Sequence, residues 1–304
     1  MYDILIIGAG PAGLTAAIYG IRAGMSVLVL EAMMYGGQIA GTPEVENYPS
    51  IQKISGWQLA QNIYEQAAAQ GAEIRFEGVT GIKEDENGIK TVITSGGRYE
   101  SKTVIIANGA KRRLLGCPGE EEFKGRGVSY CATCDGAFFR GKVTAVVGGG
   151  NTALEDSLFL SNLCEKVYLI VRKDRFRGEK RLADSVQARE NIEVLYSHVV
   201  DSIEGEDLVS SVKVKNGDGV IREIPVSAVF VAIGMEPDNG LFADFVDIDE
   251  AGYIIAGESC RTSRNGVFAA GDSRTKEVRQ IITAAADGAA AAIAAANLVN
   301  ESAV

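Results

Sequence analysis

Two stretches of the chain share one order of segments: an apolar run, a glycine-rich turn and a helix-forming segment. The first is YDILIIGAGPAGLTAAIYGIRAG, residues 2–24, and the second is KVTAVVGGGNTALEDSLFLSNLC, residues 142–164. A further apolar run follows each stretch, at residues 26–32 and 166–173. Strand, tight turn, helix and strand form the repeating unit of a doubly wound parallel sheet. The repeat therefore predicts an α/β protein with two Rossmann-like, three-layer ββα nucleotide-binding domains.

Two later apolar runs, TVIIANGA at 103–110 and AVFVAIGM at 228–235, each lead into a glycine. Each run is expected to close the sheet of one domain. Short connections that contain Gly and Pro follow both runs, near residues 111–117 and 235–241. Because the two connections leave and return at one place in the predicted fold, we interpret them as a hinge.

This arrangement predicts that one domain is inserted into the other. Residues 1–112 and 240–304 are expected to form the first, discontinuous domain. Residues 113–239 are expected to form the second domain, which contains the Cys-X-X-Cys pair of the chain.

The remaining elements follow from the same patterns. A helix is expected over residues 12–23, ended by Gly24. Residues 85–106 are expected to form a hairpin and a return strand, because Asn-Gly and Gly-Gly pairs interrupt the apolar runs. In the last third we expect a strand within residues 265–272 and a long Ala-rich helix over about residues 278–298.

Composition limits the class of protein. The chain has 304 residues, 46% of them hydrophobic, which is enough for two cores. Its net charge of -10 argues against nucleic acid or an anionic membrane as the main partner. The apolar N-terminus lacks the basic residues of a secretory signal, and the apolar tract at 288–299 is shorter than a membrane span. Five cysteines, only two of them close together, predict a reducing cytoplasm.

The first glycine turn has the spacing of a dinucleotide-binding motif. In such a turn the first glycine permits a tight bend, the second lets a pyrophosphate approach the backbone, and the third lets helix and strand pack closely. Glu31 stands at the end of the next predicted strand, where a carboxylate meets ribose hydroxyls. The predicted cofactor-binding residues of this turn are Gly8, Gly10, Pro11, Ala12, Gly13 and Glu31.

The second glycine turn differs at the end of its following strand. There the sequence has cations, Arg172, Lys173 and Arg177, in place of a carboxylate. Cations at this place suit the 2′-phosphate of NADP(H), although a charged run that only faces water remains the alternative. The predicted residues of the turn are Gly148, Gly150, Asn151, Thr152 and Ala153. FAD in the first site and NADPH in the second imply hydride transfer between nicotinamide and flavin.

Cys131 and Cys134 form the only close cysteine pair, and Asp135 follows directly. Zinc would need further ligands, but the other cysteines and the single histidine are scattered in the sequence. A redox dithiol fits the spacing best, with an ordinary loop as the second alternative. Asp135 is then interpreted as the proton donor to the sulfurs, or as a helix cap. The scattered residues are Cys117, Cys164, Cys260 and His198.

The whole chain resembles the low-molecular-weight thioredoxin reductases. The resemblance rests on GAGPAGLTAAIY, GGQ, EVENYP, CATCDGAFF, VVGGGNTALE, RKDRFR and GVFAAGDSRTKEVRQIITAAADG, in family order. It implies an FAD- and NADPH-dependent homodimer, whose two domains rotate against each other to reduce thioredoxin. It departs from the family at Val171, where a histidine is usual, at Lys173, where an arginine is usual, and in ANGA at 107–110, where ATGA is commoner.

The resemblance also implies roles for single residues. Cys134 would face the flavin, Cys131 would attack the thioredoxin disulfide, and Asp135 would act as general acid and base. Asp272 would bind the ribityl chain of the flavin. The other residues placed near the flavin are Gly37, Gln38, Asn47, Gly271, Arg279, Gln280 and Ile281. Cys117 has no implied role and is expected to be a small apolar residue.

We therefore expect an NADPH-dependent thioredoxin-disulfide reductase. The alternatives within the same fold are a different donor such as ferredoxin, a different acceptor such as a glutaredoxin-like or peroxiredoxin-reducing module, and a dithiol oxidase that uses oxygen. A redox sensor without turnover is the non-enzymatic alternative. The sequence does not distinguish among disulfide-bearing partners, because docking depends on surface shape.

Overall fold

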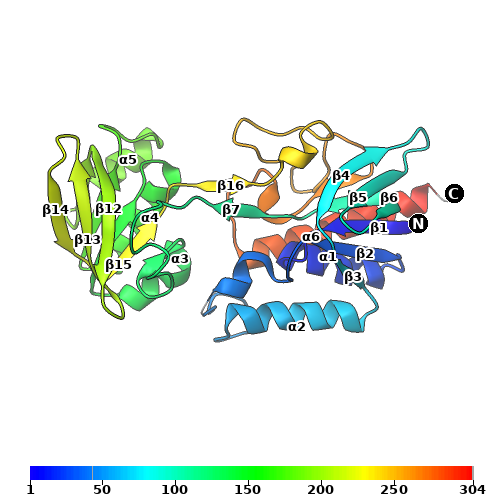
Figure 1. The fold of residues 1–304 in the computed structure, drawn as a ribbon, viewed down its shortest axis with the longest axis horizontal. Helices are drawn as coiled ribbons and strands as arrows, with labels where there is room; N and C mark the ends of the chain where they lie inside the picture. The colour runs from blue at the N-terminus through cyan, green and yellow to red at the C-terminus, as the bar shows by residue number, and fades with distance from the viewer. Residues whose placement is uncertain (43, 303–304) are drawn as a thin grey trace. The chain divides into compact units, whose positions relative to one another are not determined.

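The computed structural model describes residues 1–42 and 44–302, so the last two residues of the predicted first domain lie outside the described part. The chain divides into two compact units, each described here by itself. The first unit comprises Met1–Lys111 and Glu236–Val304, and the second comprises Arg112–Met235. In Figure 1 the second unit is the green and yellow part of the ribbon.

The first unit is built on a sheet in which β3, β2, β1, β6 and β17 run parallel. The long strand β6 pairs with β5 along its first half and with β17 along its second half, so the antiparallel hairpin β4–β5 extends the same sheet. The strands are β1 (Tyr2–Ile7), β2 (Val27–Glu31), β3 (Glu73–Phe76), β4 (Val79–Glu84), β5 (Lys90–Thr94), β6 (Arg98–Ile106) and β17 (Val267–Ala269).

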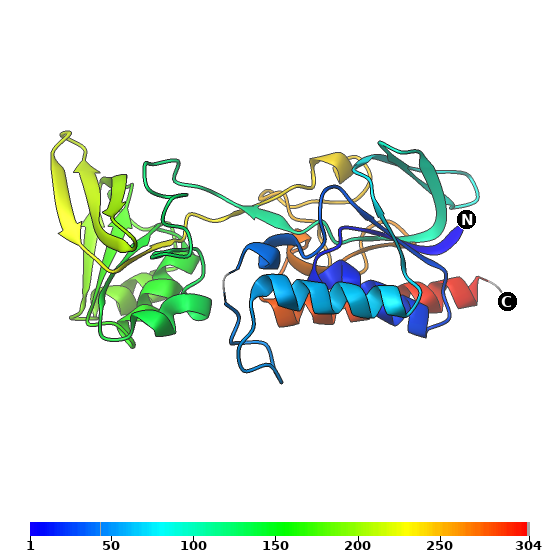
Figure 2. The ribbon, with the colours of Figure 1, turned by 60° about the horizontal axis from the view of Figure 1, so that its bottom comes forward.

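Helices α1 (Pro11–Arg22), α2 (Gly56–Ala69) and α6 (Ile281–Glu301) pack on one face of this sheet, as Figure 2 shows. Alternate strand residues such as Ile4 and Ile6 face these helices, whereas Leu5 and Ile7 face the opposite side. There they meet Phe242 and its neighbours from the segment that follows the second unit. The sheet therefore has a core on each face, as parallel sheets require.

Helix α6 is longer than the apolar tract seen in the sequence, and it begins later than expected. The helix has 21 residues and includes an 18-residue window with a mean hydropathy of 1.5, so it is long and apolar enough to cross a membrane. It packs as a core helix instead, with Gly288 so close to α1 that a Cβ there would overlap the carbonyl oxygen of Ala12. The helix begins at Ile281 rather than near residue 278, because Gln280 caps it and makes a capping box with Thr283.

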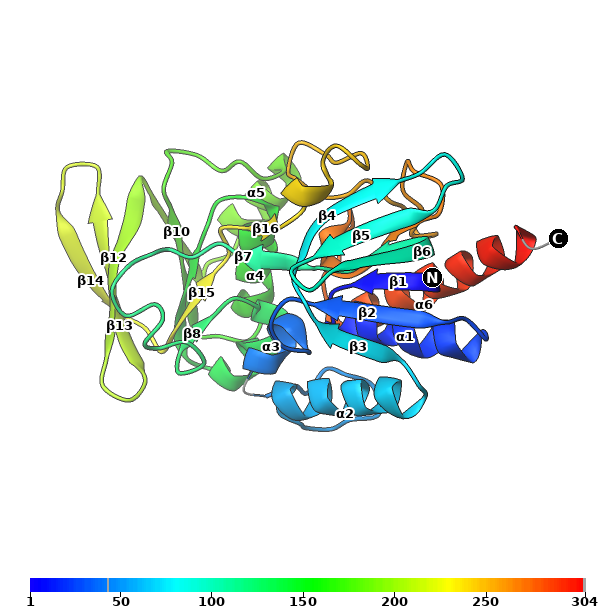
Figure 3. The same ribbon diagram turned by 45° about the vertical axis from the view of Figure 1, so that its right-hand side comes forward.

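The second unit has three layers. Its central parallel sheet has the order β11–β10–β9–β15–β8. Helices α3, α4 and α5 pack on one face, and the antiparallel sheet β12–β13–β14 packs on the other, as Figure 3 shows. This layering agrees with the predicted ββα class. The helices are α3 (Ala132–Asp135), α4 (Asn151–Ser161) and α5 (Lys180–Gln187). The strands are β8 (Val128–Ser129), β9 (Val143–Val147), β10 (Lys166–Val171), β11 (Ile192–Tyr196), β12 (His198–Gly205), β13 (Val209–Asn216), β14 (Ile221–Pro225) and β15 (Ala228–Val231).

The two connections between the units pair with each other as a short ribbon of β7 (Ala110–Arg112) and β16 (Met235–Pro237). Lys111 and Asp238 form an ion pair of 2.7 Å beside it. After the ribbon, the chain is anchored in the first unit by the buried amide of Asn239, which donates to the carbonyl oxygens of Gly252 and Ser273. Within the described residues the fold also contains four short 3₁₀ turns: Gly37–Gly41, Gly136–Phe139, Gly240–Phe242 and Gly271–Ser273.

Candidate active site and nucleotide-binding turns

The first glycine turn joins β1 to α1. Gly8 has a φ of 106°, and a Cβ at this residue would overlap the carbonyl oxygen of Ala107. A Cβ at Gly13 would overlap the carbonyl oxygen of Gly8, so helix and turn pack without room for a side chain. A Cβ at Gly10 would meet nothing within 4 Å. Gly8 and Gly13 are therefore required by the fold, whereas Gly10 leaves open space before the helix.

That open space lies at the N-terminus of α1, between Gly10 and Ala12. Within the described residues no side chain caps the helix, and its first turn contains no acidic residue. Amides at such an end attract an anion, and this arrangement fits a pyrophosphate. The carboxylate of Glu31 lies beside the turn, where it accepts hydrogen bonds from the amides of Ala9 at 2.9 Å and Met33 at 3.1 Å.

The second glycine turn repeats this geometry between β9 and α4. Gly148 has a φ of 151°, and a Cβ there would overlap the carbonyl oxygen of Ala232. A Cβ at Gly150 would meet nothing within 4 Å, and no side chain in the described chain caps α4. Ala153 occupies the place that Gly13 has in the first turn. The second turn therefore also fits a pyrophosphate.

The basic segment after β10 folds back onto the second turn. The amide of Arg177 donates to the carbonyl oxygen of Gly149 at 2.7 Å. Asn151 holds the segment in place, because its side chain exchanges two hydrogen bonds with Glu179, at 2.8 and 3.2 Å. The side chains of Arg172, Lys173 and Arg177 are exposed beside the turn, as is Thr152 at its helix start. This location suits the 2′-phosphate of NADPH.

The structure explains the unusual Val171. Its side chain is buried, and its Cγ1 would lie 2.9 Å from a Cβ at Gly149. Val171 thus packs beneath the glycine turn, so the cations of the segment come from the residues that follow it.

The residues that the resemblance places near the flavin lie in the first unit and come from distant parts of the sequence. The amide of Asn47 donates to the side-chain oxygen of Gln280 at 3.1 Å, although the two are 233 residues apart. The side chain of Gln38 donates to the carbonyl oxygen of Ala110. Arg279 stacks on the ring of Tyr253, 4.2 Å from its centroid. Gly37 begins the first 3₁₀ turn, and Gly271 and Asp272 begin the last one.

A buried ion cluster, which the sequence analysis missed, supports the turn at Gly271. Asp287 on α6 accepts hydrogen bonds from the amide of Gly271 at 3.0 Å, from Arg274 at 2.8 and 2.9 Å, and from Lys276 at 2.8 Å. Burial alone would raise the pKa of Asp287, but the hydrogen bonds from the two cations outweigh it and hold the pKa below its usual value. The cluster therefore fixes the loop that carries Asp272.

Cys131 and Cys134 form a disulfide in the second unit, with their Cα atoms 5.3 Å apart. Cys131 is the N-cap of α3, and Asp135 is the last residue of that helix. Ser129, at the end of β8, donates to Asp135 Oδ2 at 2.6 Å and accepts from the amide of Cys131 at 3.1 Å. Burial raises the pKa of Asp135 above its usual range, while Ser129 and the charge of Arg112 pull the pKa down.

The buried carboxylate of Glu120 is hydrogen-bonded to Tyr130, the residue before Cys131. Glu120 accepts hydrogen bonds from the amides of Leu115 and Gly116, at 2.9 and 2.7 Å, and from the hydroxyl of Tyr130 at 3.0 Å. Burial, followed by the charge of Glu120, raises the pKa of Tyr130. Sequence spacing gave no signal for this contact, because the three partners are not arranged in a recognisable motif.

The other cysteines are not part of a ligand cluster in the described chain. Within residues 1–42 and 44–302 no three or more His, Cys, Asp or Glu side chains gather as metal ligands. Cys117, Cys164 and Cys260 are free thiols, and burial raises the pKa of Cys117 and Cys260 to about 11. Cys117 packs half-buried against the core between the two sheets of the second unit, as a small apolar residue would. His198 lies on β12, with Nδ1 2.6 Å from the carbonyl oxygen of Tyr196.

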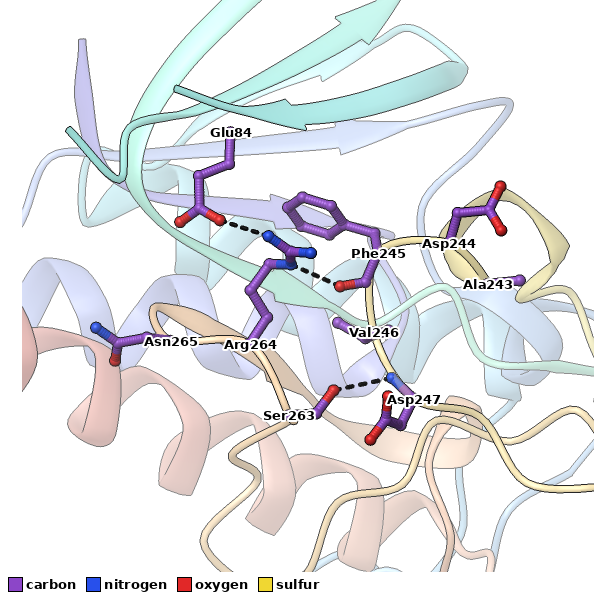
Figure 4. A pocket seen from close by; sticks show the side chains of 9 residues that line it. All are labelled: Glu84, Ala243, Asp244, Phe245, Val246, Asp247, Ser263, Arg264 and Asn265. Atoms are coloured by element: carbon purple, nitrogen blue, oxygen red, sulfur yellow. Dashed lines mark hydrogen bonds and ion pairs between the residues drawn. The ribbon is translucent and has the colours of Figure 1, made fainter. Parts of the chain in front are cut away.

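A shallow pocket of about 490 Å³ in the first unit contains none of these residues. Figure 4 shows that its Arg264 points toward Glu84 and toward the carbonyl oxygen of Phe245, both at 2.7 Å. The guanidinium also lies 4.3 Å from the centroid of the Phe245 ring. Arg264 thus fastens two loops to the hairpin, and the pocket carries no nucleotide-binding feature.

Comparisons with known proteins identify the family of the chain. Residues 2–288 match the family model described as pyridine nucleotide-disulphide oxidoreductase. The thioredoxin reductase of Treponema pallidum is 46% identical over 98% of this chain and 97% of its own. The bifunctional thioredoxin reductase/thioredoxin of Mycobacterium leprae is 43% identical over 96% of this chain and 65% of its own. The crystal structure of thioredoxin reductase from Streptococcus pyogenes superposes with a TM-score of 0.94, at 42% identity and 99% coverage of both chains. The chain therefore belongs to the pyridine nucleotide-disulphide oxidoreductase family, among its thioredoxin reductases.

Proposed function

We propose that this chain reduces the disulfide of thioredoxin with electrons from NADPH, passed through FAD and the Cys131–Cys134 pair. The observation that carries the proposal is the disulfide itself, which lies next to a half-buried carboxyl, Asp135, in the unit that contains the second glycine turn. A disulfide so placed can accept and pass on an electron pair.

The two turns support different nucleotides. Glu31, beside the first turn, would accept hydrogen bonds from the ribose hydroxyls of FAD. The exposed cations Arg172, Lys173 and Arg177, beside the second turn, would bind the 2′-phosphate of NADPH. When bound, NADPH would supply a hydride and FAD would supply an electron pair for the disulfide. The first unit is thus the proposed FAD-binding domain and the second the proposed NADPH-binding domain.

The chain's own residues then handle sulfur and protons. Two electrons break the Cys131–Cys134 bond, and two protons convert the resulting thiolates to thiols. Asp135 would give one of these protons and become ionised. Cys131 would lose its proton to solvent and, as a thiolate, attack a disulfide sulfur of thioredoxin and release a thioredoxin thiolate. Attack of Cys134 on Cys131 would then restore the internal disulfide and release the second thioredoxin thiolate.

We expect the second unit to turn about the two connections during this cycle. One arrangement of the two units would not serve both steps, because the dithiol and the nicotinamide would compete for the same place against the flavin. The ribbon of β7 and β16 joins the units by two short strands, which suits a hinge. If flavin reduction by NADPH stayed fast in protein cross-linked with its dithiol against the flavin, rotation would be unnecessary.

The partner is proposed from the relatives. The Mycobacterium leprae relative is named as both a reductase and a thioredoxin, which supports thioredoxin as acceptor. The resemblance supports a homodimer, and three free cysteines support a reducing cytoplasm. Nucleic acid and membrane are not expected partners of so acidic a chain. The names of the relatives do not favour a ferredoxin donor, an oxidase or a sensor.

NADPH oxidation by purified yellow protein with a panel of thioredoxins tests the proposal. Turnover is expected with NADPH and a thioredoxin, and much less with NADH. Cys131→Ser should stop turnover while flavin reduction by NADPH remains. Normal thioredoxin turnover by Cys131→Ser would overturn the dithiol assignment. Oxygen consumption with dithiols, without NADPH consumption, would favour the oxidase instead.

A further inference from the structure

Ser129 is a buried hydroxyl that no motif singles out. It ends β8, where it pairs with Phe230 of β15, and its side chain is only 6% exposed. The strand therefore holds its Oγ in a fixed place beside the start of α3, close to the dithiol and to Asp135.

The hydroxyl links Cys131 to Asp135. Its single proton is donated to Asp135 Oδ2 at 2.6 Å, since the carbonyl oxygen of Cys131 at 3.4 Å is the poorer acceptor. The same oxygen accepts the amide proton of Cys131 at 3.1 Å. Among the described residues, this is the only hydrogen bond to the Asp135 carboxyl, so Oδ1 remains to carry a proton.

We propose that Ser129 is a positioning residue that orients Asp135 for proton transfer to the dithiol. The inference rests on the proposed function, because it needs Asp135 as the proton donor. With Oδ2 held by Ser129, the acidic proton resides on Oδ1. When the electron pair breaks the Cys131–Cys134 bond, that proton passes to the departing sulfur, and solvent restores it to Asp135.

The chemistry of the hydrogen bond predicts a change in pH dependence. A hydroxyl that donates to a carboxyl stabilises the ionised form, and its loss makes that carboxyl titrate at higher pH. Loss of one hydrogen bond to a charged group corresponds to about one pH unit. A merely structural role for Ser129 would lower stability without moving the pH profile.

The variants separate the hydroxyl from the space it fills. Ser129→Ala removes the hydroxyl. The side chains introduced by Ser129→Thr and Ser129→Val have nearly the same shape, but only threonine carries a hydroxyl. Comparison of these two variants tests the proposal even if Ser129→Ala folds poorly. Ser202→Ala is the matched control, because Ser202 is buried in the same unit and also donates to a carboxylate, Glu204, at 2.6 Å.

Two measurements on the holoenzyme test the proposal. Stopped-flow absorbance across pH 5–9 follows exchange of electrons between flavin and dithiol. Iodoacetamide labelling of the reduced dithiol, followed by mass spectrometry, reports the pH at which the sulfurs ionise and needs no turnover. Ser129→Ala and Ser129→Val should slow exchange about tenfold on the acidic side of the midpoint, where Asp135 is protonated in every variant. They should also move both pH midpoints, the exchange midpoint upward by about one unit. Ser129→Thr and Ser202→Ala should resemble wild type.

The proposal would be overturned if the pH midpoints of exchange and of labelling did not move in Ser129→Ala and Ser129→Val. It would also be overturned if Ser129→Thr and Ser129→Val had the same midpoints and exchange rates. The proposed function fails separately. If wild-type protein did not turn over thioredoxin while Ser129→Ala still moved the labelling midpoint, the positioning role would stand and the acceptor would be wrong. If Asp135→Asn left exchange unchanged, Asp135 would not be the donor and the proposal would fall with it.

Discussion

The buried carboxylate of Glu120 accepts a hydrogen bond of 3.0 Å from the hydroxyl of Tyr130. Through its bonds to Leu115 and Gly116, the same carboxylate ties the first connection of the second unit to the residue before the dithiol. The loop that carries Cys131 is therefore fastened to the end of the proposed hinge by one side chain. A change in either segment is expected to affect the other.

Tyr130→Phe removes the hydroxyl and leaves the ring in place. We expect a loss of about 2 kcal/mol in the free energy of unfolding, measured by urea denaturation, because one hydrogen bond to a charged group disappears. Tyr19→Phe is the control, since Tyr19 is 42% exposed and its hydroxyl has no hydrogen bond within the described residues. Equal stability of the two variants would mean that the bond to Glu120 contributes nothing.

Asp287→Asn leaves the buried cations Arg274 and Lys276 without their counter-charge. We expect a loss of about 3 kcal/mol in unfolding free energy at pH 7 and weaker retention of FAD, because the turn at Gly271 loses its anchor. The pKa of Asp287 is lowered in the folded protein, so its contribution is present above the ordinary carboxyl pKa of 3.8 and lost as pH falls through the lowered value.

The difference in unfolding free energy between wild type and Asp287→Asn should therefore shrink below about pH 4. Urea denaturation at a series of pH values measures it. A difference that stayed constant down to pH 2 would show that Asp287 acts by shape rather than by charge.

Gly10→Ala and Gly150→Ala test the two nucleotide sites with little disturbance of the fold. Both positions have φ values ordinary for alanine, and a Cβ would enter open space before the helix. We expect unchanged melting temperatures, with lower FAD content for Gly10→Ala and about tenfold weaker NADPH binding for Gly150→Ala. Gly13→Ala should fold poorly, because its Cβ would overlap the backbone. If Gly10→Ala lost NADPH binding and Gly150→Ala did not, the first turn rather than the second would be the NADPH site.

Part of this site follows from sequence and part does not. The glycine turns were predictable, because Gly8 and Gly148 meet backbone atoms that forbid a side chain, and the strands and helices around them have regular apolar patterns. The start of α6 was placed too early, because the capping role of Gln280 is a local contact within a polar segment. Ser129 and Asp287 could not be found, since their hydrogen bonds depend on where the folded chain brings together residues without a shared motif.

Asp135→Asn removes the acidic proton but keeps a side chain of similar shape. Flavin reduction by NADPH should be unchanged, and exchange between flavin and dithiol should slow by about 100-fold. Because burial raises the pKa of Asp135, the wild-type carboxyl holds its proton to higher pH than an exposed one would. The wild-type exchange rate should fall as pH rises through that pKa, and the variant should show a flat profile in stopped-flow measurements. A variant that kept the wild-type profile would assign the proton donor elsewhere.

A count of thiols after a single reduction tests whether electrons reach thioredoxin through the Cys131–Cys134 pair. Holoenzyme is mixed anaerobically with NADPH sufficient to reduce both flavin and disulfide, then labelled at its cysteines and analysed by mass spectrometry, with and without oxidised thioredoxin. We predict new label on Cys131 and Cys134 together, and loss of that label when thioredoxin is added and becomes reduced. If thioredoxin became reduced while Cys131 and Cys134 were never labelled, electrons would not pass through this pair and the proposed route would be wrong.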